Sequence, residues 1–296
     1  MKKSLWVLAA LLAVGAAQAE DTLKKIKDTG TVTMGVRESS GLSYTIGDGK
    51  YVGFHIDVCT KVLADVQKQL GLAKLDVKYQ PVTSQNRIPL VQNGTVDIEC
   101  GSTTNNATRQ KDVAFAVTTY VEEVRIATKA NSGINSIKDL NGKTIATTTG
   151  TTSVQTLRKH ERATGVDFKE VFGKDHADSF LLLDSGRADA FVMDGSILAK
   201  NIATSKNPHD FKIVGEVLSV EPIAIMMRKD DPAFKKAVDD SIKAMIKSGD
   251  MAKLWDKWFL QPIPPAGAKI GLALNDATKQ AWANPNDKPM EEYAKK

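Results

Sequence analysis

A dense group of polar side chains directly follows one apolar stretch of the sequence. Residues 95–99 are predicted to form a strand, and hydroxyl and amide side chains occupy 102–106, with Arg109 close behind. Ligands bind at the carboxyl ends of strands in open α/β sheets. A guanidinium grips a carboxylate through two parallel hydrogen bonds. The pattern indicates an anion site that includes Ser102, Thr104 and Arg109, although by itself it is equally typical of a polar surface loop.

A second candidate anion site follows another predicted strand. Residues 143–148 lead into Gly150 and then a helix that is expected to run to about residue 160. Thr152 lies at the start of this helix, where free backbone N–H groups attract anions. Helix capping by a hydroxyl residue explains the same position without a ligand.

The two halves of the chain repeat one arrangement. A predicted helix at 84–91 precedes the strand at 95–99, and a predicted helix at 179–184 precedes a strand at 188–193. The second strand ends at Asp194, as the first ends near Ser102. Two similar lobes would each present a polar strand end, and a ligand could lie between them.

These motifs require elements that alternate along the chain. Residues 31–36 read as a strand that ends at Arg37, and 57–70 as a helix with apolar residues at helical spacing that stops at Gly71. Such alternation is typical of mostly parallel sheets flanked by helices. We expect an α/β fold in two lobes, the first formed by 20–121 plus 221–296 and the second by the inserted segment 122–220.

The C-terminal third is expected to complete the first lobe. Residues 221–227 are strand-like, and a long amphipathic helix begins at Pro232. Trp255, Trp258 and Phe259 near its end are interpreted as core, because their helical spacing needs no ligand. The polar tail after residue 265 is expected to lie across the first lobe.

The N-terminus has the features of an export signal. Two lysines precede an apolar run, and small residues end at Ala19, which predicts a signal peptide over 1–19, cleavage after Ala19 and a periplasmic location. Removal of Lys2 and Lys3 lowers the formal charge from +5 to +3. A mild charge without basic runs argues against nucleic acid and is compatible with an anionic small ligand.

Cysteine and histidine usage points away from redox and metal chemistry. The sequence contains Cys59 and Cys100, which lack the CxxC spacing of a redox or zinc site. In an oxidising compartment these cysteines are expected either to form a disulfide or to remain as two buried free thiols. The four histidines are scattered, so no metal site or cofactor is expected. His55, His160 and His209 are interpreted as surface residues.

Several motifs together resemble the polar amino-acid binding proteins of ABC importers over essentially the whole mature chain. These are STTNNATRQ, the GTTS that follows a strand, GRADAFVMD and LWDKWF. More narrowly, the chain is similar to the periplasmic glutamate/aspartate-binding proteins in the segments RESSG, TSQNRIPLVQNG, ECGSTTNN, KDHADSF and QPIPP. The resemblance implies a two-lobed binding-protein fold with a two-stranded hinge.

The resemblance also implies roles for individual residues. Arg109 would bind the α-carboxylate with Thr104 and Thr152, and Asp194 would bind the α-ammonium with help from Ser102. The positions that match those holding the side-chain carboxylate are Arg37, Ser84, Arg87 and His176.

Charge balance supports this assignment independently. A buried amino-acid head group needs one cation and one anion as partners, which Arg109 and Asp194 supply. A second ligand carboxylate needs the further cations Arg37 and Arg87, so the expected ligand is glutamate or aspartate. We expect closure at two hinge crossings, near 120–123 and 219–222, and a monomer that docks on a membrane permease.

Other functional classes fit less well. No GxSxG or HExxH motif indicates a hydrolase. A lyase or dehydratase on the same fold is the main alternative, but it would need a general acid against the substrate, whereas this chain keeps a full set of head-group partners. A receptor sensory domain would be accompanied by transmembrane and signalling segments. We therefore expect a binding protein and no enzyme.

Overall fold

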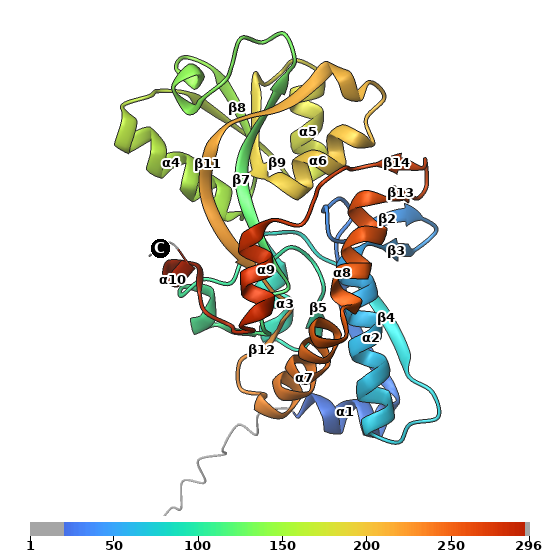
Figure 1. Cartoon of the computed structure of the whole chain (residues 1–296). Helices are drawn as coiled ribbons and strands as arrows, with labels where there is room; N and C mark the ends of the chain where they lie inside the picture. The colour runs from blue at the N-terminus through green and yellow to red at the C-terminus, as the bar shows by residue number, and fades with distance from the viewer. Residues whose placement is uncertain (1–20, 294–296) are drawn as a thin grey trace, which may run out of the picture.

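The computed structural model describes residues 21–293 and has two lobes, each built on a five-stranded sheet (Figure 1). The predicted signal peptide lies outside the described residues. The sheet of lobe 1, at the bottom of Figure 1, has the strand order β4 (Asp76–Pro81), β1 (Thr31–Val36), β5 (Ile98–Glu99), β12 (Met226–Arg228) and β6 (Val113–Phe115). The sheet of lobe 2 has the order β11 (Phe211–Ile223), β7 (Tyr120–Lys129), β10 (Ala190–Asp194), β8 (Thr144–Thr148) and β9 (Lys169–Gly173). The expected two-lobed α/β fold is confirmed.

Helices cover both faces of the lobe 1 sheet. On one face lie α2 (Phe54–Gln69), α7 (Pro232–Ser248) and α8 (Asp250–Trp255), with α1 (Thr22–Thr29) at the end of the sheet. On the other face lies α3 (Arg87–Gln92). Trp255 stacks on Phe259 and Tyr120 at ring-centroid distances of 3.9 and 4.4 Å, and Trp258 is buried. The three aromatic residues of the 255–259 segment are core, as their spacing predicts.

Lobe 2 repeats this layered design. Helix α4 (Thr152–Thr164) covers one face through Leu157, and α5 (His176–Asp184) and α6 (Gly195–Ala203) cover the other through Leu183 and Ile197. Each helix directly follows, or closely follows, a strand of the sheet. The helices therefore begin at the carboxyl ends of the strands.

The strands that link the lobes make both sheets mixed. Strand β1 is parallel to β4 and β5, and β8 is parallel to β9 and β10. In contrast, β12 is antiparallel to β5 and β6, and β7 is antiparallel to β10 and β11. In each sheet one strand, β12 or β7, therefore runs against the other four, so the sheets are mostly parallel, as expected, with one antiparallel strand each.

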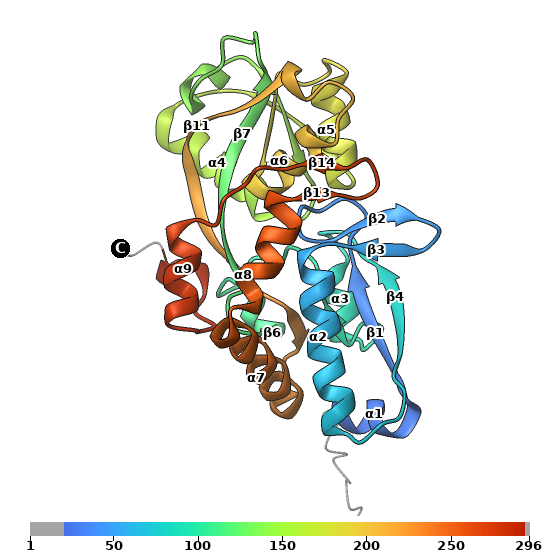
Figure 2. The same ribbon diagram turned by 45° about the vertical axis from the view of Figure 1, so that its right-hand side comes forward.

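Two long antiparallel strands, β7 and β11, run from one lobe to the other (Figures 1 and 2). Their pairing extends from Tyr120 opposite Ile223 to Lys129 opposite Phe211, with an irregularity between Val214 and Ser219. The expected two-stranded hinge is present. The chain bends after Ile223, so the strand expected at 221–227 is divided between β11 and β12.

A disulfide joins Cys59 of α2 to Cys100, the residue after β5. Of the two possibilities that the sequence left open, the disulfide is the one present.

The long helix expected from Pro232 is divided into two helices. Gly249 has a φ of 80°, in the left-handed region that favours glycine, and it separates α7 from α8.

The C-terminal segment packs on lobe 1 and on the back of the hinge. It contains β13 (Pro262–Ile263), β14 (Ala268–Lys269), α9 (Asp276–Ala283) and α10 (Met290–Tyr293). Trp282 Nε1 donates to the Thr119 carbonyl at 3.0 Å, and the Val121 N–H donates to Thr278 Oγ1 at 2.9 Å.

The sequence did not predict the hairpin of β2 (Tyr44–Gly47) and β3 (Lys50–Val52). No helix within residues 21–293 has the length and apolar character needed to cross a membrane.

Candidate functional site

Three strand ends of lobe 1 carry cations and hydroxyls toward the second lobe. Arg37 directly follows β1, and Ser102 and Thr104 follow its parallel neighbour β5, with Gly35 opposite Glu99 in the register. Arg87 is the first residue of α3, and its Nη1 donates to the Ser102 carbonyl at 3.2 Å. Parallel strands end at the same edge of a sheet, so these side chains gather there.

Lobe 2 presents helix N-termini to this edge. Thr152 is the first residue of α4, His176 the first of α5, and Asp194 the residue before α6. Unpaired N–H groups and the helix dipole make such positions favourable for anions. Asp194, the last residue of β10, adds an acid among them.

The two lobes touch across the cleft. Arg37 Nη2 donates to Asp175 Oδ1 at 2.6 Å, and Ser39 Oγ donates to Asp175 Oδ2 at 2.8 Å. A Cβ on Gly41 would lie 2.6 Å from the Ser196 carbonyl oxygen, and one on Gly150 would lie 2.8 Å from the Gln85 backbone. The lobes therefore approach more closely than larger residues would allow, which is a closed arrangement.

His176 is held as a neutral imidazole beside Arg37. Arg37 Nη2 lies 3.0 Å from His176 Nε2, and Nδ1 lies 3.0 Å from Thr148 Oγ1. Because the guanidinium can only donate, Nε2 accepts and Nδ1 carries the proton. Burial, with the charge of Arg37 adding to it, holds the pKa of His176 well below its usual value.

Thr104, Arg109 and Thr152 meet at the hinge end of the cleft. Arg109 Nη1 donates to the Thr104 carbonyl at 2.9 Å, and its Nη2 lies 3.5 Å from the Gly150 carbonyl. The Thr104 and Thr152 hydroxyls both donate to Glu221 Oε2 at 2.6 Å. In the closed arrangement the donors left for an anion here are Arg109 and backbone N–H groups of α4.

Unpartnered polar atoms mark where a ligand would make contact. Within residues 21–293, five of the nine candidate residues bury a polar side-chain atom that has no hydrogen-bond partner in the protein. These atoms are Arg37 Nε and Nη1, Ser84 Oγ, Arg87 Nε, Ser102 Oγ and Asp194 Oδ1. Buried polar groups normally have partners. Donors from lobe 1 and an acceptor from lobe 2 thus lie ready for a polar molecule with charges of both signs.

Burial dominates the electrostatics of these groups. It lowers the pKa of Arg87 to about 9, with the Arg109 charge adding to the shift and Glu99 opposing it. Burial also raises the pKa of Asp194 well above its usual value, helped by Glu122 and Glu221. An ammonium group beside Asp194 and a carboxylate beside the arginines would reverse both shifts.

The sequence did not single out four acids that complete the site. Glu99, Glu122 and Glu221 are buried, and Asp175 pairs with Arg37. Glu122 and Glu221 lie in the expected hinge crossings, which was a usable signal, since acids are costly to bury between two lobes. Asp175 directly precedes His176, which the sequence did identify as a candidate site residue. Glu99 lies in an apolar strand and carried no signal of its own.

One histidine was interpreted wrongly. His55 is fully buried, with ring nitrogens contacting the Gly101 carbonyl and, at 2.8 Å, Thr119 Oγ1. Burial lowers its pKa to about 4. It is the second residue of α2 and lies on the buried face of that helix, so packing of the helix carries it inside. His209 is exposed, and His160 is partly buried against the Leu218 carbonyl at 2.9 Å.

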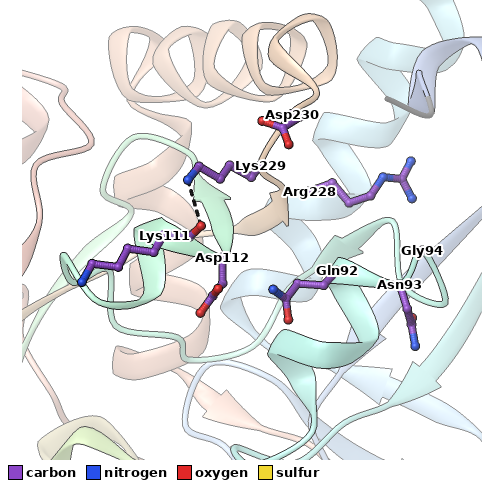
Figure 3. Close-up of a pocket in the computed structure, with 8 residues that line it drawn as sticks. All are labelled: Gln92, Asn93, Gly94, Lys111, Asp112, Arg228, Lys229 and Asp230. Atoms are coloured by element: carbon purple, nitrogen blue, oxygen red, sulfur yellow. Dashed lines mark hydrogen bonds between the residues drawn. The ribbon is translucent and has the colours of Figure 1, made fainter. Parts of the chain in front are cut away.

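Two hollows show where the protein is open to small molecules. One of about 620 Å³ runs along the seam between the lobes, with Ser84 and Arg109 on one side and Thr152 and Phe172 on the other. Another, of about 590 Å³, is shown in Figure 3 and lies at the opposite edge of the lobe 1 sheet. Lys229 Nζ donates there to the Lys111 carbonyl at 2.8 Å, and none of the candidate residues lines it.

Across the described part of the chain, no group of three His, Cys, Asp or Glu side chains is placed to hold a metal ion. The buried acids instead accept hydrogen bonds from hydroxyl groups or pair with arginines.

Known proteins resemble this chain over most or nearly all of its length. The L-glutamate/L-aspartate-binding protein of Pseudomonas aeruginosa is 44% identical over 290 residues, covering 97% of this chain and 96% of its own. The glutamate/aspartate import solute-binding protein of Escherichia coli K12 is 43% identical over 297 residues, covering 98% of each. A crystal structure of a mutant ArgBP from T. maritima has a TM-score of 0.70 at 28% identity, covering 80% of this chain and 98% of that one.

A family match covers most of the chain. Residues 32–261 match the bacterial extracellular solute-binding proteins, family 3, and this range includes parts of both lobes and all nine candidate residues. The two bacterial relatives align with 97% and 98% of this chain, so the similarity extends beyond the residues that match the family. The chain belongs to family 3 of the bacterial extracellular solute-binding proteins.

Proposed function

We propose that this protein binds glutamate or aspartate in the cleft between its lobes and delivers it to the permease of an ABC importer. The observation that carries the proposal is the set of unpartnered buried atoms, with guanidinium groups on lobe 1 and the Asp194 carboxylate on lobe 2. A glutamate/aspartate import solute-binding protein and an L-glutamate/L-aspartate-binding protein, 43% and 44% identical over nearly the whole chain, support it. Those relatives are transport proteins, and this protein too is a binding protein rather than an enzyme.

Each charged group of the ligand has a proposed partner. Arg109 binds the α-carboxylate together with N–H groups near Thr152, and Asp194 binds the α-ammonium. The side-chain carboxylate lies between Arg37 and Arg87. Ser84, Ser102 and Thr104 supply further polar contacts, and His176 holds Arg37 in place through the 3.0 Å contact.

The same charges explain selectivity. A neutral amide in place of the second carboxylate would leave a buried guanidinium without a counter-ion, and a basic side chain would meet repulsion. Glutamate and aspartate differ by one methylene, worth about 0.8 kcal/mol when buried. The charge pattern therefore selects an acidic ligand and leaves the two acids close in affinity.

Cellular context follows from the family and the expected export signal. We propose that cleavage after Ala19 releases a monomer into the periplasm, with residues 122–220 as the inserted lobe. Ligand binding to the open form draws Arg109 and Asp194 toward one molecule and closes the lobes on the β7–β11 hinge. The closed form then docks on the permease.

Calorimetric titration with glutamate, aspartate, glutamine and lysine tests the ligand class. The acidic amino acids are expected to bind tightly, and glutamine at least about a hundredfold more weakly, since it strands a buried charge. Tight binding of glutamine or lysine alone would overturn the proposal. Arg87→Gln provides a matched variant, because removing one cation should narrow the gap between glutamate and glutamine.

A further inference from the structure

Glu221 on β11 holds one hydroxyl from each lobe. Its Oε2 accepts hydrogen bonds from Thr104 of lobe 1 and Thr152 of lobe 2, both at 2.6 Å. Its Oε1 accepts from Ser219 of the same strand at 2.7 Å. The side chain is fully buried. A single hinge carboxylate therefore connects the two lobes directly at the cleft.

This connection requires the closed arrangement. Thr104 Oγ1 and Thr152 Oγ1 lie only 3.3 Å apart, although Thr104 follows a lobe 1 strand and Thr152 starts a lobe 2 helix. Hydrogen bonds from a hydroxyl to an oxygen span only about 2.5 to 3.0 Å, so separating the lobes removes at least one hydroxyl from Oε2. Bonds to an ionised acceptor are about twice as strong as neutral ones. Opening the cleft must break such a bond.

The position of Glu221 is unfavourable without this role. It lies directly opposite Glu122 in the β7–β11 register, and both side chains are buried. Like charges at opposed strand positions destabilise a sheet, and a buried carboxylate loses its hydration. Glu122 is held by Ser196 of α6, and the Arg109 charge lies close enough to interact with Glu221. The hydroxyls of the closed lobes supply the remaining compensation.

We propose that Glu221 is a positioning residue that latches the lobes in the closed form and sets how long a bound ligand is retained. The identity of the ligand rests on the proposed function, whereas the latch depends only on the two lobes. Because a ligand enters and leaves through the open form, and opening must break a bond to Glu221, the latch should slow dissociation more than association.

Stopped-flow measurement of glutamate dissociation tests retention. Glu221→Ala should raise the dissociation rate at least about tenfold, with an association rate within about threefold of wild type. Glu221→Gln keeps an acceptor oxygen and should recover part of the loss. Ser219→Ala is the control, because it removes a bond to the same carboxylate without unlinking the lobes. Equal dissociation rates for wild type and Glu221→Ala would overturn the latch.

A second measurement does not use the ligand. A spin label on the exposed residue Gln155 (as Gln155→Cys), which shares the seam with Ile88 of lobe 1, reports closed molecules through relaxation of lobe 1 amides. Glu221→Ala and Thr152→Val should both lower the closed fraction of the ligand-free protein, and the double variant should add little. An unchanged closed fraction in both single variants contradicts the latch. Failure of wild type to bind glutamate would instead contradict the proposed function alone, and Thr152→Val keeps the test usable if Glu221→Ala does not fold.

Discussion

At the scale of single residues, the cleft contains buried positive charges that the acidic residues of the protein do not fully neutralise. Arg37, Arg87 and Arg109 are all buried on lobe 1, and their charges interact unfavourably, since Arg109 and Arg37 each lower the pKa of Arg87. Asp175 neutralises only Arg37 directly. A ligand with two carboxylates relieves this repulsion, whereas a cationic ligand adds to it.

Replacing Arg109 tests the head-group assignment. Arg109→Ala should weaken glutamate binding by about 3 to 5 kcal/mol in calorimetry, because it leaves a buried carboxylate without its partner. The glutamate affinity of Arg109→Lys should lie between those of the wild type and Arg109→Ala, since lysine keeps the positive charge but cannot form two parallel hydrogen bonds. Arg158→Ala is the control, as this exposed arginine lines the same hollow and pairs with Glu170. Wild-type affinity in Arg109→Ala would refute the assignment.

Glu122 should make stability depend on pH. Burial raises its pKa from 4.5 to about 7, with Glu221 adding to the shift and hydrogen bonds from Ser196 opposing it. Because the folded-state pKa is raised, the stabilising contribution is complete below the unfolded value and is lost as pH rises through about 7. Relative to Glu122→Gln, the wild-type free energy of unfolding should fall by up to about 3 kcal/mol as pH rises from about 4.5 to 8. Urea unfolding at several pH values measures this, and a pH-independent difference would contradict it.

At the scale of elements, long periodic patterns were predicted well and short buried ones poorly. The helix expected at 57–70 is α2 at Phe54–Gln69, and the strand expected at 31–36 is β1 at Thr31–Val36. The strand expected at 95–99 shortens to Ile98–Glu99, because pairing with β1 sets its limits. Local pattern determines whether an element forms, and neighbours determine where it ends.

The disulfide is an element-level brace beneath the site. It ties α2 to the segment that leads into Ser102 and closes a loop with a sequence separation of 41 residues. Loop entropy then predicts that reduction lowers the free energy of unfolding by about 4 kcal/mol. Denaturant unfolding with and without reductant measures this, with the Cys59→Ser/Cys100→Ser variant as a control insensitive to reductant. No change in the wild type on reduction would contradict the expectation.

At the scale of the whole molecule, function depends on a relation between two bodies. Lobe 1 supplies the guanidinium groups and lobe 2 supplies Asp194 and three helix N-termini, so in the proposed function neither lobe alone can bind both charged groups of an amino acid. The β7–β11 pair allows the lobes to approach, and the C-terminal helices pack behind it. We propose that closure of the lobes joins these two half-sites into one buried site.

The sequence by itself determined the chemistry of this protein: which residue types end each strand, the alternation that builds two α/β lobes, and the motifs of a solute-binding family. These features are local, because side-chain type and apolar spacing act within a few residues. Only the tertiary structure decided that the Thr104 and Thr152 hydroxyls are used by Glu221, that His176 is neutral beside Arg37, and that His55 is buried. Those outcomes depend on residues far apart in the chain that meet when the lobes close, and burial then sets their charge.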